Sequence, residues 1–244
     1  MERCSKKIFP DSAQASRYCA DSLINIIKNK PDALICLAAG HTSLEFFDIV
    51  AREFESGGVD FSRVKAVGLD EWVGISGQDD GSCESFLQTN IFGRVNIDRN
   101  NIRLFNGKAA DLKRECREMD EYIISNGGID YMFLGLGMNG HLALNEPGVD
   151  PECTSHVMPL DSVTQDVATK YFKQMPCISR GITLGIKNIL DSKRIHVLVT
   201  GKKKSGIIKR LFDSQPTNML PATLLFGHEN AEFVMDKQAA SLLE

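Results

Sequence analysis

The sequence lacks the features that point to a membrane or a nucleic acid as a partner. Its longest apolar run, residues 33–39 (ALICLAA), is far shorter than the roughly 20 residues that a membrane-spanning helix needs. The first residues, MERCSKKIFPDS, contain no apolar signal-peptide core. Basic residues are not in excess, because 28 Lys and Arg stand against 32 Asp and Glu, for a formal net charge of −4. We therefore expect no membrane partner, no nucleic-acid partner and a cytoplasmic location.

Cysteine motifs are missing as well. The seven cysteines are an odd number, and no two of them form a CxxC pair. Scattered cysteines of this kind are typical of free thiols in a reducing compartment. The pattern predicts neither disulfides nor a cysteine-based zinc site, and it marks no cysteine as a nucleophile.

What the sequence does contain is an alternation of strand and helix patterns over residues 1–244, which we expect to form one domain. The predicted strands are 33–39, 64–70, 102–105, 129–137, 181–186, 194–201 and 231–236. The predicted helices are 12–30, 43–56, 82–92, 110–125 and 202–212. Such alternation predicts an α/β fold of three layers: a doubly wound, mostly parallel, Rossmann-like sheet with helices on both faces.

In parallel sheets, ligands bind in the crevice beyond the carboxyl ends of the strands, so the residues at those ends are the candidates for function. The first such end is the turn Gly40-His41-Thr42-Ser43. Its backbone N–H groups and the helix N-terminus that follows could receive a phosphate. The alternative is an ordinary strand-to-helix turn in which Thr42 or Ser43 is the N-cap.

Two further strand ends carry charged residues. Asp70 and Glu71 follow a buried strand, and because neighbours in an extended chain point oppositely, one carboxylate could face the crevice while the other makes structural bonds. A solvated acidic loop is the alternative. Lysines 202–204 stand at a strand-to-helix junction, where the helix dipole disfavours cations. An anion bound there would explain the cluster, and a solvated basic helix start is the alternative.

The segment 134–148 (LGLGMNGHLALNEPG) holds the densest set of functional residue types. Its GxGxxG pattern suggests a dinucleotide fold, but Pro147 and Gly148 interrupt the helix that this fold requires. His141 and Glu146 suit general acid/base catalysis, since a carboxylate fixes the imidazole tautomer and supports its charged form. A metal site would need two further ligands that the sequence does not mark, so we expect no metal.

Three of these segments carry a resemblance to a known family. Gly40-His41-Thr42, residues 69–73 (LDEWV) and residues 137–148 (GMNGHLALNEPG) resemble the signature motifs of the glucosamine-6-phosphate deaminases. These enzymes share their fold with the 6-phosphogluconolactonases, which usually carry DER in place of DEW and lack the Asn-Glu pair. The combination of LDEWV with residues 81–87 (GSCESFL) and 181–185 (GITLG) is similar to the galactosamine-6-phosphate isomerase branch.

The resemblance implies a reaction and roles for particular residues. A 2-amino-2-deoxyhexose 6-phosphate, with galactosamine 6-phosphate favoured over glucosamine 6-phosphate, is opened, isomerised by proton transfer from C2 to C1 and deaminated to a ketohexose 6-phosphate. No cofactor takes part, and the enzyme would be an isomerase and deaminase, and a hydrolase by class. Asp70 would take the C2 proton, His141 would act on the ring oxygen during opening, and Glu146 would orient His141 and balance its charge.

The resemblance also implies how the substrate is held. Phosphate would lie on residues 40–43 (Gly40, His41, Thr42, Ser43) and on Lys204 and Lys170, while Glu71, Gly137 and Gly140 would line the pocket. Many deaminases have Asp where this chain has Asn139, which can orient the imidazole but cannot carry charge. A sugar phosphate is the expected partner, and a homo-oligomer is left open. A lactonase and a non-catalytic sugar-phosphate sensor are the competing hypotheses.

Overall fold

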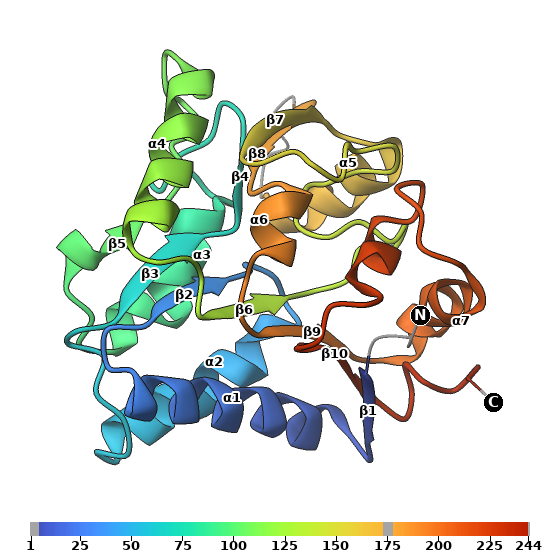
Figure 1. Ribbon diagram of the computed structural model, residues 1–244, viewed down its shortest axis with the longest axis horizontal. Coiled ribbons are helices and arrows are strands. Elements are labelled where there is room, and N and C mark those ends of the chain that lie inside the picture. The colour runs from blue at the N-terminus through green and yellow to red at the C-terminus, as the bar shows by residue number, and fades with distance from the viewer. Residues whose placement is uncertain (1–4, 173–177, 244) are drawn as a thin grey trace.

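The computed structural model describes residues 5–172 and 178–243, and its centre is a parallel sheet (Figure 1). The strands run in the order β1-β10-β9-β6-β2-β3-β5, and every neighbouring pair is parallel. Their bounds are β1 Ser5–Phe9, β2 Leu34–Leu37, β3 Lys65–Gly68, β5 Ile102–Arg103, β6 Tyr131–Leu134, β9 Ile195–Val199 and β10 Ala231–Asp236. This order confirms the predicted doubly wound α/β fold. The chain runs outward from β2 to β5, returns to β6 beside β2, and runs outward again on the other side.

Helices cover both faces of the sheet. Their bounds are α1 Ser12–Asn29, α2 Ser43–Glu55, α3 Cys83–Asn90, α4 Leu112–Ser125, α5 Ser162–Ala168, α6 Ile186–Leu190 and α7 Ser205–Asp213. In Figure 1, α1 and α2 lie below the sheet, whereas α4 and α6 lie above it. The longest helices begin where the sequence supplies a cap: Asp11 accepts a hydrogen bond from the Gln14 N–H at 2.8 Å, and Asp111 accepts one from the Arg114 N–H at 3.0 Å. None of the helices within the described ranges is long and apolar enough to cross a membrane.

A second, antiparallel sheet stands above the first and was not predicted. It has the order β4-β8-β7, with β4 at Asp70–Trp72, β8 at Arg180–Thr183 and β7 at His156–Pro159. The prediction of a parallel strand over 181–186 is therefore wrong: β8 belongs to this small sheet, and α6 begins at Ile186. The pattern GITLGI marks a buried strand, but which partner that strand pairs with depends on residues far away in the sequence.

The edge strand β1 also lies outside the sequence prediction. Four of its five residues, Ser5–Ile8, are exposed, so the segment shows no buried face that a hydrophobic pattern could reveal. It is held by parallel pairing with β10, from Ser5 opposite Glu232 to Phe9 opposite Asp236.

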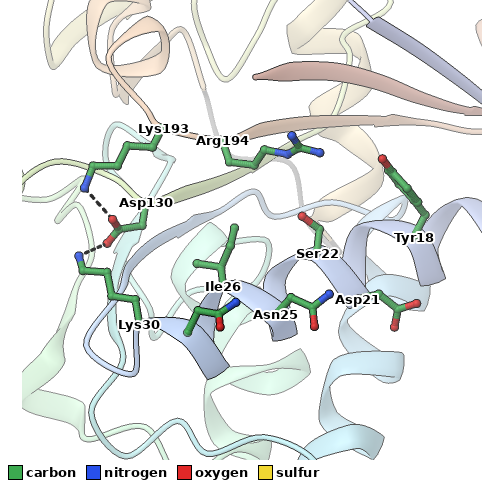
Figure 2. Close-up of a pocket in the computed structure, with 10 residues that line it drawn as sticks. Tyr18, Asp21, Ser22, Asn25, Ile26, Lys30, Asp130, Lys193 and Arg194 are labelled. Carbon is green, nitrogen blue, oxygen red and sulfur yellow. Dashed lines mark hydrogen bonds and ion pairs between the residues drawn. The ribbon is translucent and has the colours of Figure 1, made fainter. Parts of the chain in front are cut away.

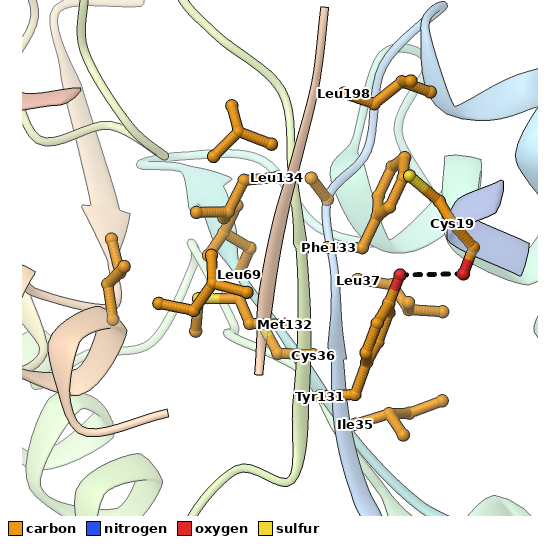
Figure 3. Close-up of a cluster of buried hydrophobic side chains, with 14 of the residues drawn as sticks. Cys19, Ile35, Cys36, Leu37, Leu69, Tyr131, Met132, Phe133, Leu134 and Leu198 are labelled. Carbon is orange, nitrogen blue, oxygen red and sulfur yellow. Dashed lines mark hydrogen bonds between the residues drawn. The ribbon is translucent and has the colours of Figure 1, made fainter. Parts of the chain in front are cut away.

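The hydrophobic core lies on both faces of the central strands, and its packing holds the carboxyl ends of these strands in place. Figure 3 shows Tyr131 and Phe133 on one side of β6 and Met132 and Leu134 on the other, as the two-residue period of a strand requires. All four are at most 1% exposed. The Tyr131 hydroxyl donates to the Cys19 carbonyl at 3.1 Å, so even the polar end of this ring is satisfied inside the core.

The described cysteines, Cys19, Cys36, Cys83, Cys116 and Cys153, are free thiols, as predicted for them. Cys4 and Cys177 lie outside the described residues.

Candidate active site

Four neighbouring strands bring most of the predicted site residues to one edge of the sheet. Residues 40–43 follow β2, Asp70 follows β3, residues 135–146 follow β6 and Lys204 follows β9. Strands β3, β2, β6 and β9 are adjacent in this order, so their carboxyl ends share one crevice. The crevice lies where the winding of the sheet reverses, between β2 and β6, which is the place where open α/β sheets bind ligands.

A hydrogen-bonded cluster around His141 occupies the end of β6. The Glu146 Oε2 atom lies 3.3 Å from His141 Nδ1 and accepts a hydrogen bond from Asn139 Nδ2 at 2.8 Å. The Asn139 Oδ1 atom in turn accepts from the His141 N–H at 3.2 Å. Burial works to raise the pKa of Glu146, but hydrogen bonds from His141, Thr164 and Asn139 outweigh it and lower the pKa of this carboxyl. Glu146 is therefore a carboxylate that fixes one ring nitrogen of His141 and leaves Nε2 available for a ligand.

Two glycines in the same segment make room for this cluster. A Cβ on Gly137 would lie 2.2 Å from Cδ2 of His141, so the imidazole packs directly against the Gly137 backbone. Gly140 has φ +87°, and a Cβ there would lie 2.2 Å from Cδ1 of Leu220. The structure gives both glycines a role in shaping the turn. Their expected role in lining a substrate pocket stays a prediction.

The rest of the segment is held in a strained turn. Ala143 has φ +56°, the only positive φ of a non-glycine residue in the described ranges. Asn145 is fully buried, and its Nδ2 group donates to the carbonyls of Leu142 and Leu184, both at 2.9 Å. Because Leu184 directly follows β8, Asn145 joins this turn to the small sheet.

Asp70 lies at the start of β4, on the opposite wall of the crevice. Burial raises its pKa to about 7, and the negative charge of Glu71 adds to the rise. A hydrogen bond from Cys83 and the proximity of His141 act in the opposite direction. The residue keeps partial access to solvent. A partly accessible carboxyl with a pKa near neutrality can both take and return a proton at physiological pH.

Glu71 is used for structure and does not line the crevice. It is 1% exposed. Its Oε2 accepts from the Ser82 hydroxyl at 2.7 Å and the Glu84 N–H at 3.1 Å, and its Oε1 accepts from the Trp72 and Cys83 N–H groups. The expected role of Glu71 in the substrate pocket has no support, because both oxygens are occupied in holding the start of α3. The adjacent carboxylates thus divide as the alternation of an extended chain predicts, with Asp70 toward the crevice.

The turn after β2 offers fewer phosphate ligands than the four expected residues. The Ser43 N–H already bonds the Gly40 carbonyl at 3.0 Å, and the Ser43 hydroxyl donates to the Ala38 carbonyl at 2.8 Å. Ser43 therefore shapes the turn and is not placed to bind phosphate. Gly40 has φ +140°, and the Thr42 side chain makes no capping hydrogen bond to α2. Gly40, His41 and Thr42 remain the candidates at this helix N-terminus.

Lys204 is the lysine of its cluster that turns inward. Lys202 and Lys203 are exposed, whereas Lys204 is partly buried and donates to the Leu136 carbonyl. Burial lowers the pKa of Lys204 to about 8, and the charge of Lys170 lowers it further. Lys170 lies in the 3-10 turn Thr169–Tyr171, close enough to Lys204 for this repulsion. The two cations would bind an anion together, because an anion between them relieves their mutual repulsion.

Two residues of the segment 161–172 belong to the site and were missed by the sequence analysis. Thr164 is buried, and its hydroxyl oxygen lies 3.1 Å from His141 Nδ1. The Tyr171 ring lies 5.5 Å from the His41 ring, and its hydroxyl would be 3.8 Å from a Cβ on Gly40. Burial raises the pKa of Tyr171, and the negative charge of Asp70 contributes. No motif marks either residue, since only tertiary folding brings this segment over the crevice.

The described residues contain no group of three or more His, Cys, Asp or Glu side chains that could hold a metal ion.

Comparisons with known proteins match nearly the whole chain. The family model described as glucosamine-6-phosphate isomerases/6-phosphogluconolactonase matches residues 11–235. A glucosamine-6-phosphate deaminase of Clostridium perfringens is 35% identical over 232 residues, which are 95% of this chain and 96% of that protein. One from Thermoanaerobacter sp. is 36% identical over 231 residues, covering 94% of this chain and 91% of that protein.

Solved structures extend the comparison. A structure described as a monomeric glucosamine-6-phosphate deaminase superimposes with a TM-score of 0.94 at 30% identity, covering 98% of this chain and 99% of that one. The 6-phosphogluconolactonase of Trypanosoma brucei has a TM-score of 0.78 at 18% identity over the full length of both chains, a likeness of fold alone. The expected class of hydrolase is therefore wrong: the close relatives are named deaminases, and the lactonases, which would hydrolyse an ester, are similar only in fold.

Proposed function

The chain belongs to the family of glucosamine-6-phosphate isomerases and 6-phosphogluconolactonases, and on that premise we propose that it deaminates and isomerises a 2-amino-2-deoxyhexose 6-phosphate. The products are a ketohexose 6-phosphate and ammonia. The observation that carries the proposal is the pairing, at one crevice, of a carboxyl with a pKa raised to about 7 and a His–Glu pair. The chemistry needs both: one group to move a carbon-bound proton and another to move the proton of a ring oxygen.

Asp70 is the proposed base for the proton at C2. Its raised pKa keeps a usable fraction of both protonation states near neutral pH, so it can take the proton from C2 and return it at C1. Burial outweighs the lowering effect of the nearby His141 on the pKa of the Asp70 carboxyl, so the carboxyl is not held permanently ionised. Cys83, whose thiol contacts this carboxyl, is a positioning residue.

His141 is the proposed acid/base for ring opening. Glu146 and Thr164 both contact Nδ1, so Nε2 is the nitrogen that faces the substrate. Glu146 stabilises the imidazolium that forms when His141 takes a proton, and Asn139 fixes Glu146 from its other side. Because Glu146 is the charged partner of His141, this arrangement does not need the Asp that many relatives have in place of Asn139.

The phosphate is proposed to lie on the Gly40–Thr42 turn and between Lys204 and Lys170. A substrate anchored there, with C2 at Asp70, spans from β2 to the neighbouring β3. Tyr171 lies beside both the turn and Asp70, and is thus our candidate for contact with the C3 and C4 hydroxyls. No cofactor has a role in these steps.

The epimer is the finer part of the proposal. The LDEWV, GSCESFL and GITLG segments favour galactosamine 6-phosphate as the substrate, and the names of the relatives support glucosamine 6-phosphate as the second candidate. The two sugars differ only at C4, and a single hydrogen bond to one of the two configurations is sufficient to separate the kcat/KM values of the two sugars by about tenfold.

A cytoplasmic location belongs to the same proposal. The solved relative described as monomeric favours a monomer over the homo-oligomer left open above.

The test is ammonia release by the purified protein from glucosamine 6-phosphate and galactosamine 6-phosphate, with hydrolysis of 6-phosphogluconolactone followed in parallel. Ammonia from either sugar, lost in Asp70→Asn and kept in the control Asp191→Asn, supports the proposal. Asp191 is exposed, and its ion-pair partner among the described residues is Lys187. Lactone hydrolysis without ammonia would replace the proposal with a lactonase. Binding of both sugars without turnover would replace it with a sensor.

A further inference from the structure

A second cavity lies at the opposite edge of the sheet from the catalytic crevice. It has a volume of about 610 Å³ and lies at the amino ends of β6 and β9, between α1 and the residues that precede these strands. Figure 2 shows Asp130, Lys193 and Arg194 along one side of this cavity and α1 along the other, with Lys30 at the end of α1 pointing toward Asp130. The volume is within the range of small-molecule sites, roughly 300–1,000 Å³.

The wall formed by α1 carries a stripe of short, neutral, hydrogen-bonding side chains, together with Ile26 and with Asp21, whose carboxylate pairs with Arg17 at 2.9 Å. Ser22, Asn25 and Asn29 line the cavity at helical spacing, and they continue the line of Tyr18 along one face of the helix. Within the described ranges, the side chains of Ser22, Asn25 and Asn29 have no hydrogen-bond partner. Such groups are suited to donate to and accept from the hydroxyls of a polyol.

The opposite wall has more positive than negative charge. Lys30 and Lys193 both pair with Asp130, at 2.5 and 2.7 Å, and Asp130 also accepts the Leu34 N–H. One carboxylate that is only 6% exposed therefore serves two ammonium groups. Burial favours a raised pKa for Asp130, but the two lysines lower it, so the carboxyl stays ionised. One cation of the pair is left without a matching anion.

Arg194 adds a third cation, and its guanidinium is held in place from behind. Its Nη2 atom donates to Glu232 Oε2 at 3.0 Å, and its Nε atom lies 3.3 Å from Nε2 of the fully buried His196. Glu232 also accepts from the Tyr18 hydroxyl at 2.8 Å. These contacts leave donors of the guanidinium free, and 31% of the side chain is exposed at the cavity. Three cations, Lys30, Lys193 and Arg194, thus line the cavity and share the carboxylates of Asp130 and Glu232. The third acid, Asp21, pairs with Arg17, which lies outside the lining.

We propose that this cavity is a second ligand site, for the phosphate monoester of a small polyhydroxylated molecule. The phosphate lies between Lys193 and Arg194, and the hydroxyls lie on the stripe of Ser22, Asn25 and Asn29. The inference does not depend on the catalytic proposal, because the two sites share no residue and lie at opposite ends of the same strands.

Inorganic phosphate is the first probe, titrated calorimetrically into the whole protein. The variant Lys204→Met weakens phosphate binding in the catalytic crevice, where Lys170 and the Gly40–Thr42 turn remain, so the part of the binding that Lys193→Met removes in this background reports on the second cavity. We expect saturable binding to Lys204→Met at millimolar phosphate, and a loss of affinity of about tenfold when Lys193→Met is added, as for the loss of one charge-assisted hydrogen bond. Asp130 keeps Lys30 and the Leu34 N–H in this variant, so the fold should be retained.

The matched control is Lys187→Met, which removes another exposed lysine, on α6, whose ammonium pairs with Asp191 just after that helix. It should leave phosphate binding unchanged. The absence of saturable binding to Lys204→Met, or equal effects of Lys193→Met and Lys187→Met, would overturn the proposal.

The polyol part is tested with glucose 6-phosphate in the same Lys204→Met background. Asn29→Ala should weaken glucose 6-phosphate severalfold and leave inorganic phosphate nearly unchanged. The side-chain amide signals of Asn25 and Asn29 should shift in an NMR titration with the sugar phosphate. Equal affinities of this variant for both probes would limit the site to a bare anion and overturn the assignment to a polyol phosphate.

Discussion

Buried carboxyl groups have oppositely shifted pKa values at the two ends of the central strands, called here the amino edge and the carboxyl edge of the sheet. At the amino edge, each buried acid has cationic partners: Asp130 has two lysines, and the pKa of Glu232 is lowered to about 2 by His196, Tyr18 and Arg194 despite burial. At the carboxyl edge, the pKa of Asp70 is raised to about 7 because burial outweighs the opposing effects of the Cys83 hydrogen bond and the His141 charge. The first arrangement stabilises the fold, and the second keeps a carboxyl reactive at a cost in stability.

The turn that follows β6 combines backbone strain with unpartnered polar atoms. Among the described residues, four buried side-chain atoms lack hydrogen-bond partners: Glu146 Oε1 and Asn145 Oδ1 in this turn, and Arg103 Nε and His156 Nε2 elsewhere. The strained residue Ala143 lies in the same turn as the first two. Strain and unmet hydrogen-bonding capacity therefore coincide where a ligand is expected to bind, and the surrounding core can hold such a turn in place.

The largest effect is expected from Asp70→Asn. Loss of a general base should lower kcat by about two to four orders of magnitude while sugar-phosphate binding is retained. Ionisation of a buried carboxyl with a raised pKa destabilises the fold. The contribution of Asp70 to the free energy of unfolding is therefore favourable at low pH, and it is lost as the pH rises through about 7. The variant should thus melt at a higher temperature than the wild type at pH 8 and at a similar temperature at pH 4. A lower melting temperature of Asp70→Asn than of the wild type at pH 8 would contradict the conclusion that the buried carboxyl of Asp70 destabilises the fold.

Glu232→Gln should have the reverse effect. The lowered pKa of Glu232 contributes stability above the ordinary glutamate pKa of 4.5, and this contribution is lost as the pH falls toward about 2. At pH 7 the variant should lose about 3 kcal/mol of unfolding free energy, measured by urea denaturation. The control is Glu121→Gln, at an exposed position on α4. A loss no greater than in the control would show that the amino edge is not a stabilising cluster.

The pH dependence of kcat/KM should be bell-shaped and narrow. Asp70 must be ionised, which sets a rise near pH 7, and Lys204 must be charged to hold phosphate, which sets a fall near pH 8. In Lys204→Arg the guanidinium keeps its charge, so the alkaline fall should move upward while the acid side stays in place. An unchanged alkaline side would remove Lys204 from the phosphate site.

The smallest effect is expected from Tyr171→Phe. Removal of one hydroxyl should change the ratio of kcat/KM for the two epimers by less than about tenfold, the range of one neutral hydrogen bond. The measurement compares galactosamine 6-phosphate with glucosamine 6-phosphate in both proteins. An equal change in kcat/KM for the two sugars would mean that the Tyr171 hydroxyl does not distinguish them and that Tyr171 only packs against His41.

The location of the site motifs could be predicted from the sequence, because each motif consists of residues close together in the chain. The turn at Gly40, the pair at Asp70 and Glu71, and the His141 to Glu146 segment each follow a strand, and strand ends in a parallel sheet meet at one edge. The role of each residue within these motifs was harder to predict. Whether Glu71 or Asp70 faces the crevice, and whether Ser43 bonds a carbonyl or a ligand, depends on which donors α3 and the end of β2 bring nearby.

The sequence by itself determined the fold class, the family resemblance and the residues of the three motifs, because hydrophobic period and local spacing are properties of short segments. Only the tertiary structure decided the small antiparallel sheet, the placing of Thr164 and Tyr171 over the crevice, and the cavity beside Lys193 and Arg194. These features join segments far apart in the sequence, such as Tyr18 and Arg194 at the same cavity. The pKa values of Asp70 and Lys204 depend on the burial that this joining produces.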